Sequence, residues 1–298
     1  MAKFAKAKNQ AAKAVREKLA LGKPRHSDKQ SGRIHSIRTA QHYERHLANV
    51  AQWLSDTRAG HGLAKLTADE AIRYLNDKAA TASQSEVDQC RQAMECHLGQ
   101  DLTRVTSERD QVKSGRSYSR EQLQAIASSQ NERNALATQI AEASGLRAHE
   151  LLTIVPFAER PPSNHRDWEK ANFAGREYWK RYTVIGKGGL CREVRLPSDI
   201  ASKLEERRLD KHEPRSDRGV NYFSRYDLAG GNAWSKSFGD ASQRALGFSN
   251  GAHGCRHTFA QRSMEHYQSR GYSYDDALAS VAQELGHFHP KITEVYLR

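Results

Sequence analysis

The sequence lacks any long apolar run. No part of its 298 residues approaches the roughly 18 uninterrupted apolar positions that a membrane-spanning helix needs. The N-terminal segment is positively charged but has neither the apolar centre nor the cleavage site of a secretory signal. We therefore expect a cytoplasmic protein with no membrane partner.

Cysteine is scarce as well. The four cysteines, Cys90, Cys96, Cys191 and Cys255, form no C-x-x-C pair and have no histidines at zinc-finger spacing, which indicates reduced thiols rather than disulfides or a metal site. The sequence also has no glycine-rich phosphate loop and no carboxylate cluster suited to Mg²⁺. We expect no cofactor and no metal.

Acidic residues are in deficit. Lysine and arginine number 47 against 35 aspartates and glutamates, the net charge is +12, and residues 1–33 alone hold a net +8. This balance favours an acidic partner, and nucleic acid is the first candidate. The basic segment is either a solvated, partly disordered tail or an arm that folds as a helix on the DNA backbone and gains affinity by releasing counterions. Its candidate DNA contacts are Lys3, Lys6, Lys8, Lys13, Arg16 and Lys18.

The length predicts two domains, of which the first is helical over residues 34–105. In the segment QHYERHLANVAQWLSDTR, apolar residues recur at three- and four-residue steps, which is typical of an amphipathic helix. A capping box formed by Thr67 and Glu70 begins a second helix, and a third follows Ser85.

Residues 106–118 are polar, have no clear period and end in a glycine and serine cluster, so we interpret them as a linker between the domains. The basic residues of this region could follow a phosphate backbone, although a merely solvated linker is the simpler explanation. The candidate DNA contacts are Lys113 and Arg116 in this segment and Arg104 just before it.

The second domain, residues 119–298, is expected to combine helices with a small sheet. A capping box begins one helix at Ser119, and another helix ends at Gly145. A short strand, an insertion after Phe157 and a hairpin around the glycine-rich turn 186–189 follow.

The rest of this domain shows helical periodicity in four segments, at 198–212, 233–248, 252–268 and 273–287. The chain is therefore predicted to be an α+β protein, mainly α-helical with a small antiparallel β-sheet. Its expected divisions are a basic N-terminal arm (1–33), a helical domain (34–105), a linker (106–118) and the second domain (119–298).

Several side chains of the second domain stand out for their chemistry. Taken singly, each has a plain structural explanation as a salt-bridged arginine, an exposed hairpin lysine, a capping residue or a packed aromatic. Taken together, they form a set of cationic and proton-transferring groups that is far less expected by chance. The set is Arg147, Glu150, Lys187, His253, Arg256, His257, His287 and Tyr296.

In this combination the sequence resembles the tyrosine recombinases of the phage-integrase type, whose catalytic domain presents Arg, Lys, His-x-x-Arg, Gly-His and Tyr in this order. The motifs that carry the resemblance are GLRAHEL, GKGG between strands, HGCRHTFA and ELGHFHPKITEVYL. They lie within residues 119–298, whereas the likeness of residues 34–105 to the family's core-binding domain is limited to helix content. The resemblance implies a helical core-binding domain followed by a catalytic domain of this type.

The chemistry of these residue types agrees with that resemblance. A phosphodiester gains negative charge on its non-bridging oxygens when a nucleophile attacks, and arginines stabilise that charge bidentately while keeping their own. We expect Arg147 and Arg256 in this role, with His287 as a further donor. Tyr296 is the expected nucleophile, which would form a 3′-phosphotyrosyl link.

The remaining members of the set have expected roles as well. A phenol with an ordinary pKa of about 10 needs a base or neighbouring cations to attack at neutral pH. We expect His253 to be that base and Lys187 to protonate the leaving 5′-oxygen. Glu150 is expected to orient Arg147 or its neighbours. His257 is expected to pack beside the active-site helix, with a hydrogen bond to the phosphate as the alternative.

The leading hypothesis is a site-specific DNA recombinase, or integrase, that acts on double-stranded DNA in integration or excision without ATP or metal. The resemblance implies a homo-oligomer in which four protomers act on two duplexes. One alternative is a type IB topoisomerase, which nicks and reseals DNA with a similar set of residues. The other alternative is a DNA-binding protein that has lost catalysis.

The sequence departs from the family pattern at its end. Family members commonly continue past the nucleophile into a helix that docks on a neighbouring subunit, whereas Leu297 and Arg298 alone follow Tyr296. Either the chain is truncated or its assembly contacts lie elsewhere. The insertion after Phe157 is one place for them, and a plain surface loop is the alternative explanation of that insertion.

Overall fold

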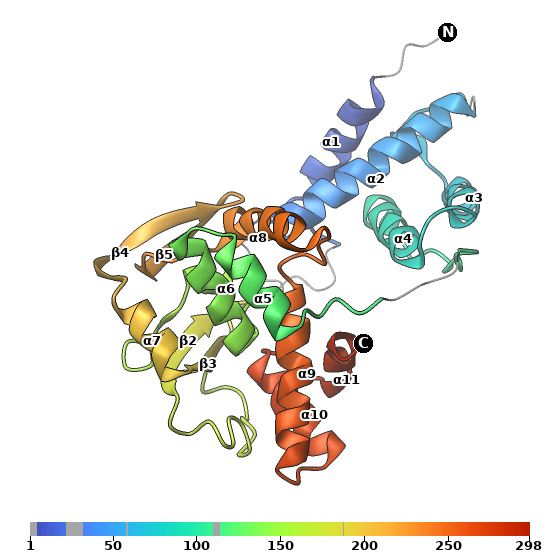
Figure 1. Cartoon of the computed structure of the whole chain (residues 1–298). Coiled ribbons are helices and arrows are strands. Elements are labelled where there is room, and N and C mark those ends of the chain that lie inside the picture. Colours follow the sequence, from blue (N-terminus) through green and yellow to red (C-terminus); the bar gives the residue numbers. More distant parts are fainter. Residues whose placement is uncertain (1–4, 22–31, 58, 110–113, 187) are drawn as a thin grey trace. The chain divides into compact units, whose positions relative to one another are not determined.

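The computed structural model describes residues 5–21, 32–57, 59–109, 114–186 and 188–298. The chain forms two compact units, Met1–Val112 and Lys113–Arg298 (Figure 1). Each unit has its own hydrophobic core. Within the described residues, no helix combines the length and the apolar character needed to cross a membrane. All four cysteines are free, as the sequence predicted.

The first unit is helical, and the apolar stripes of its helices meet in a core that includes Val50, Leu75 and Met94. Thr67 and Glu70 form the predicted capping box, in which each side chain accepts a hydrogen bond from the backbone N–H of the other residue. The elements are α1 (Ala7–Glu17), α2 (Ile37–Asp56), the 3₁₀ turn η2 (Leu63–Lys65), α3 (Ala68–Ala79) and α4 (Gln84–Leu98).

Helix α1 lies in the segment that the sequence assigned to a basic arm. Its small apolar residues Ala11, Ala14 and Val15 are buried, and they belong to the same core as α2. A boundary at residue 33 therefore does not separate an independent tail from the helical unit. The candidate DNA contacts Lys6, Lys8, Lys13 and Arg16 are exposed and Lys18 is half-buried, while Lys3 lies outside the described residues.

The second unit is mostly helical with two small antiparallel sheets, which confirms the predicted α+β class (Figure 1). Its largest core cluster includes Ile140, Trp234 and Phe238. The helices are α5 (Arg120–Ser128), α6 (Glu132–Ser144), α7 (Ser198–Glu205), α8 (Gly231–Leu246), α9 (Gly254–Ser269), α10 (Tyr274–Glu284) and α11 (Pro290–Thr293), with 3₁₀ turns η3 (Glu150–Leu152) and η4 (Glu294–Tyr296).

The predicted hairpin around residues 186–189 is present. Strand β2 (Lys180–Ile185) pairs antiparallel with β3 (Cys191–Leu196), and β1 (Val155–Pro156) adds a short third strand beside β2. Because successive side chains of a strand point to opposite faces, β3 buries Arg192 and Val194 on one side while Glu193 and Arg195 remain more accessible. The sheet therefore directs one arginine into the interior of the unit.

The predicted helix over 198–212 is wrong beyond residue 205. Helix α7 ends there, and β4 (Arg208–Asp217) pairs antiparallel with β5 (Val220–Tyr226). The turn between these strands uses Arg218 and Gly219 with φ of 50° and 78°, as a two-residue hairpin turn requires. The charged residues after α7 favour a helix locally, but pairing with the aromatic and β-branched residues of β5 outweighs that preference.

The insertion after Phe157 forms neither a helix nor a strand between its turns, and it packs against the end of α10. The ring of Trp168 lies 5.3 Å from that of Phe288, and Gln283 accepts hydrogen bonds from the backbone of Glu169 and the side chain of Asn172. The insertion is therefore a packed part of the second unit rather than a loose surface loop.

The end of the expected linker also belongs to the second unit. Tyr118 is buried, its backbone N–H donates to Thr258 Oγ1 at 2.9 Å, and its carbonyl accepts a hydrogen bond from the same hydroxyl. A Cβ atom at Gly254 would lie 2.5 Å from the carbonyl oxygen of Arg116, so only glycine permits this close approach. Residues 116–118 are thus bound to the start of α9.

The core of the first unit contains a histidine that we expect to make its stability depend on pH. His46 is 1% exposed, and neither ring nitrogen has a hydrogen-bond partner. Burial and the nearby charges of Arg45 and Lys78 lower the pKa of His46 from 6.5 to about 4. As the pH falls from 6.5 towards 4, the unfolded chain binds a proton that the folded chain does not, so the free energy of unfolding should fall by up to about 3 kcal/mol.

We predict that His46→Leu reduces this acid-induced loss, as measured by urea unfolding at pH 7 and pH 5. His61→Leu is the matched control, because Glu70 Oε1 lies 2.9 Å from the His61 ring and can compensate a charge on it. An equal loss of stability in wild type and His46→Leu would contradict the prediction.

Candidate active site

Five of the candidate catalytic residues meet in the second unit. Arg147 follows α6, His253 and Arg256 lie at the start of α9, His287 follows α10, and Tyr296 is in η4. These elements come together because α6 and α10 both pack against α9. The structure therefore gathers residues that are spread over 150 positions of the sequence.

Gly145 allows the close packing on which this meeting depends. It ends α6 in the left-handed conformation, with φ of 63°. A Cβ atom at this position would lie 2.5 Å from Phe259 Cδ1 and 2.8 Å from Leu285 Cδ2. A larger residue would therefore push the end of α6 away from α9 and from the loop after α10.

Arg256 is fully buried and bonded to the backbone on two sides. Its Nη1 donates to the carbonyl of Gly145 at 2.7 Å, and its Nη2 donates to the carbonyl of Leu285. Burial and the neighbouring charge of Arg147 lower the pKa of Arg256 to about 10. The guanidinium is thus still protonated at neutral pH.

Arg147 is half-buried and is held by a carboxylate. Its Nη1 donates to Glu150 Oε1 at 2.7 Å, and its backbone N–H donates to Glu150 Oε2 at 2.8 Å. Glu150 itself is 0% exposed. Burial alone would raise its pKa, but the charges of Arg192, Arg256 and Arg147 outweigh burial and lower the pKa of Glu150 to about 2.

His287 lies between the two arginines. Its Nε2 atom is 3.0 Å from Arg256 Nη2 and 3.3 Å from Arg147 Nη2. A guanidinium can only donate, so Nε2 is the acceptor and the proton of a neutral ring is on Nδ1. Burial and the charges of both arginines lower the pKa of His287 to about 3, which keeps the ring neutral at pH 7.

Tyr296 is 8% exposed and packs directly on this cluster. The Arg256 guanidinium carbon lies 5.2 Å from the centroid of the phenol ring, which is a cation–π contact. Ring centroids of His257, His253 and His287 lie 4.9, 5.5 and 5.9 Å from that of Tyr296. The tyrosine is therefore surrounded by the other candidate residues.

The two histidines at the start of α9 differ in exposure. His253 is exposed, whereas His257 is 6% exposed. Partial enclosure of the ring and the charge of Arg256 lower the pKa of His253 to about 4. Burial and the charge of Arg116 lower the pKa of His257. Both rings are neutral at pH 7, and His253 can accept a proton.

Sequence reasoning missed one residue of the cluster. Arg192 of β3 is 1% exposed, and its Nη2 donates to Glu150 Oε2 at 2.8 Å. Its place next to Glu193 and Arg195 in an alternating strand gives no local sign that it belongs to the site. The burial alternation of a half-buried strand is the only signal that could have indicated it.

The cluster carries an excess of positive charge. Within the described part of the chain, Arg147 and Arg192 form ion pairs with Glu150, and the charge of Arg256 also acts on this carboxylate, while His287 is neutral. This leaves two uncompensated positive charges around a partly buried site. Such a site favours binding of an anion, because the desolvation of the cations has already occurred.

The candidate DNA contacts that the structure describes around the linker lie outside this cluster. Arg104 forms an ion pair with Asp88 in the first unit, and Arg116 is exposed beside the start of α9. Lys113 and Lys187 lie outside the described residues. Gly186, which precedes Lys187, lies against the site, since a Cβ atom on it would be 3.3 Å from Glu150 Oε1. Among the described residues, no group of three or more His, Cys, Asp or Glu is arranged to hold a metal ion.

We predict that Glu150→Gln lowers the free energy of unfolding by about 3–5 kcal/mol, because it leaves Arg147 and the buried Arg192 without the carboxylate that they pair with. The measurement is urea unfolding at pH 7, followed by the fluorescence of the second-unit tryptophans. Glu142→Gln is the matched control: its partner Arg262 is 52% exposed, and loss of that pair should cost less than about 1 kcal/mol. Equal destabilisation by the two substitutions would contradict the proposed balance of charges.

Comparison with known proteins gives the fold. No family model and no curated protein matches the sequence. Among solved structures, the XerH site-specific recombinase bound to palindromic difH in a post-cleavage complex is 16% identical with a TM-score of 0.62, covering 98% of this chain and 93% of that chain. The pre-cleavage XerH complex with difH is also 16% identical, with a TM-score of 0.57 and coverage of 99% and 94%.

A lambda integrase tetramer bound to a Holliday junction is 14% identical with a TM-score of 0.53, covering 91% of this chain and 75% of that chain. These likenesses extend over nearly the whole of this chain, first unit included. The chain therefore has the fold of the XerH recombinase and of lambda integrase.

Proposed function

We propose that this protein is a site-specific DNA recombinase that cleaves and rejoins DNA strands through a 3′-phosphotyrosyl link at Tyr296. The observation that carries the proposal is the position of Tyr296, whose ring lies 5.2 Å from the buried Arg256 guanidinium in a cluster with two excess positive charges. A phenol next to a ready anion site has the arrangement needed to attack a phosphodiester. The fold shared with the XerH recombinase supports the same conclusion.

The attack begins at the phenol. His253 is neutral at pH 7 and exposed at the edge of the site, so it can accept the Tyr296 proton. The Tyr296 oxygen then bonds to phosphorus, and the bond between phosphorus and the 5′-oxygen of the next nucleotide breaks. The charge that develops on the two non-bridging oxygens is stabilised by Arg147 and Arg256.

His287 has a second part in this step. In the structure, its Nε2 accepts hydrogen bonds from both guanidiniums. It thus occupies the position that an anionic phosphate oxygen would take. When a phosphate takes those hydrogen bonds, its negative charge favours a protonated ring, and His287 then donates to the phosphate. The histidine thus changes from an acceptor to a donor as DNA binds.

The leaving 5′-oxygen needs a proton. Lys187 directly follows Gly186, whose backbone lies against Glu150, and we assign it the role of general acid. The phosphotyrosyl bond keeps the energy of the original phosphodiester, so the 5′-hydroxyl of a second strand can attack it and restore the tyrosine without ATP. No step of this sequence requires a metal.

The partner in this proposal is double-stranded DNA, and the acting species is a homo-oligomer. Lambda integrase, which shares the fold, has been solved as a dimer on a core site and as a tetramer on a Holliday junction. We propose the corresponding assembly for this chain, with four protomers on two DNA sites. The basic residues Lys6, Lys8, Lys13, Arg16, Lys18, Arg104 and Arg116, with Lys3 and Lys113, are proposed to contact the DNA backbone.

We predict a covalent protein–DNA adduct that depends on Tyr296. Wild type and Tyr296→Phe are mixed with labelled DNA fragments that flank the protein's own gene, without metal, and SDS-resistant adducts are measured. A band with wild type alone is the expected result, and sequencing the trapped DNA gives the cleavage site. An equal band with Tyr296→Phe excludes this nucleophile, and tight DNA binding with no adduct on any fragment supports a non-catalytic DNA-binding protein.

The same reaction separates recombination from topoisomerase activity. A recombinase forms adducts at one DNA sequence and exchanges strands between two copies of it. Relaxation of supercoiled plasmids at many sequences, with no exchange between paired sites, would identify a type IB topoisomerase instead.

The assignment of Lys187 makes a separate prediction. If Lys187 protonates the leaving oxygen, adduct formation by Lys187→Ala should be restored by DNA in which the 5′-bridging oxygen is replaced with sulfur, because a thiolate leaves without a proton. Arg147→Ala is the control and should not be restored, since its function is to stabilise the non-bridging oxygens. Equal restoration of the two variants would contradict the assignment.

A further inference from the structure

The mechanism proposed above leaves one fully buried guanidinium without a function. Arg192 of β3 bridges two segments of the site: its Nη2 donates to Glu150 Oε2 at 2.8 Å, and its Nη1 donates to the carbonyl of Glu284 at 2.7 Å. Glu150 holds Arg147, and Glu284 comes three residues before His287. One side chain therefore joins the loop that carries the first arginine to the loop that carries the histidine.

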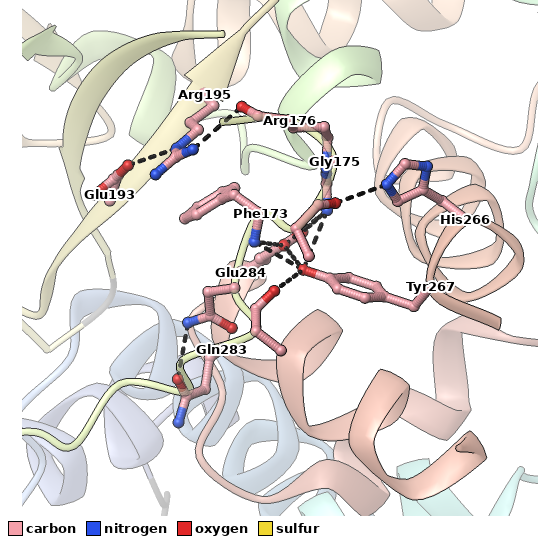
Figure 2. A network of polar contacts seen from close by, with 12 residues as sticks. Phe173, Gly175, Arg176, Glu193, Arg195, His266, Tyr267, Gln283 and Glu284 are labelled. Atoms are coloured by element: carbon pink, nitrogen blue, oxygen red, sulfur yellow. Dashed lines mark hydrogen bonds and ion pairs between the residues drawn. The ribbon is translucent and has the colours of Figure 1, made fainter. Parts of the chain in front are cut away.

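Glu284 is itself a fixed point of the fold. Figure 2 shows its carboxylate among donors from the insertion and from α9. Arg176 donates to both carboxylate oxygens at 2.7 and 2.9 Å, the backbone N–H of Phe173 donates at 3.0 Å, and the Tyr267 hydroxyl donates as well. Glu284 is therefore held in a fixed position, and so is the carbonyl to which Arg192 donates.

We propose that Arg192 is a positioning residue of the cleavage reaction. Arg192 is anchored by the carbonyl of Glu284 and in turn holds Glu150 in place. Because Glu150 bonds Arg147, this contact fixes the position of the Arg147 guanidinium relative to His287 and Arg256. This inference rests on the proposed function, because it concerns the geometry of the same phosphate site. Arg192 itself is enclosed and does not contact the DNA.

The planar shape of the side chain explains why an arginine is required. A guanidinium donates from two nitrogens held in one plane, so it can bond a carboxylate on one side and a carbonyl on the other. A lysine carries its three N–H donors on a single nitrogen, so it cannot reproduce the two separate, coplanar donor positions of Nη1 and Nη2. Arg192→Lys thus keeps the positive charge of the cluster while it breaks the bridge.

The test is single-turnover adduct formation by the full chain on the DNA site that wild type cleaves. The rate constant at saturating protein measures the geometry of the reacting groups, and the final amplitude measures the fraction of folded protein. We expect Arg192→Lys to lower the rate constant by about tenfold to a hundredfold, as a small misplacement of catalytic groups does. The amplitude and the affinity for DNA should stay within about threefold of wild type, because the net charge is unchanged.

Arg181→Lys is the matched control. Arg181 lies on β2 of the same sheet, and its guanidinium donates to the two carboxylate oxygens of Glu193. Its substitution should leave the rate constant unchanged. A double variant with Arg147→Lys provides a second check: if Arg192 acts through Arg147, the two effects on the rate constant should not multiply.

Two results would overturn the inference. The first is a rate constant for Arg192→Lys within about twofold of wild type, and the second is a loss confined to the amplitude, which a purely structural role produces. If Arg192→Lys does not fold, Tyr267→Phe tests the bridge from its other end, since it removes one donor to Glu284 but keeps the ring. Its rate constant should fall severalfold at full amplitude, and an unchanged rate constant would then overturn the inference.

Failure of the proposed function gives a different result. In that case wild type forms no Tyr296-dependent adduct at all. An adduct formed equally well by wild type and Arg192→Lys leaves the proposed function standing and removes only the role of Arg192.

Discussion

One buried carboxylate determines the geometry of the candidate active site. The two oxygens of Glu150 accept hydrogen bonds from Arg147 and Arg192, and its charge also acts on Arg256. Without this negative charge, three guanidiniums in a region of low dielectric would repel one another strongly. The same cations keep Glu150 ionised, with a pKa of about 2, so the carboxylate and the arginines depend on each other.

The cluster is only partly neutralised, and this has a physical consequence. Backbone carbonyls of Gly145, Glu284 and Leu285 accept hydrogen bonds from Arg256 and Arg192, but a carbonyl is a dipole and cancels no net charge. A second carboxylate would make the free protein more stable and would weaken its attraction for a phosphate. In the free state His287 occupies the acceptor position between the arginines as a neutral group.

The sequence predicted the members of the site that have a chemical signature. Arg147, His253, Arg256, His287 and Tyr296 could be named because their residue types fit one reaction, and the capping box at Thr67 and the β2–β3 hairpin followed from local rules. Arg192, the Arg176 to Glu284 pair and the β4–β5 hairpin could not. Their roles come from partners that are distant in the sequence, as in the pair of residues 108 positions apart, and no local pattern specifies a distant partner.

The loop that carries His287 shows why such distant contacts matter to the chemistry. Gly286 has a positive φ of 76°, so the loop leaves the helical path directly after α10 and cannot take its rigidity from the helix. Its position is set by its neighbours instead: the insertion holds the Glu284 carboxylate, Arg192 holds the Glu284 carbonyl, and Arg256 holds the Leu285 carbonyl. By composition the insertion is a polar surface loop, yet through Arg176 it fixes the side chain of Glu284, two residues before the chain turns at Gly286. The position of His287, a candidate catalytic residue, therefore depends on the buried ion pairs around its loop.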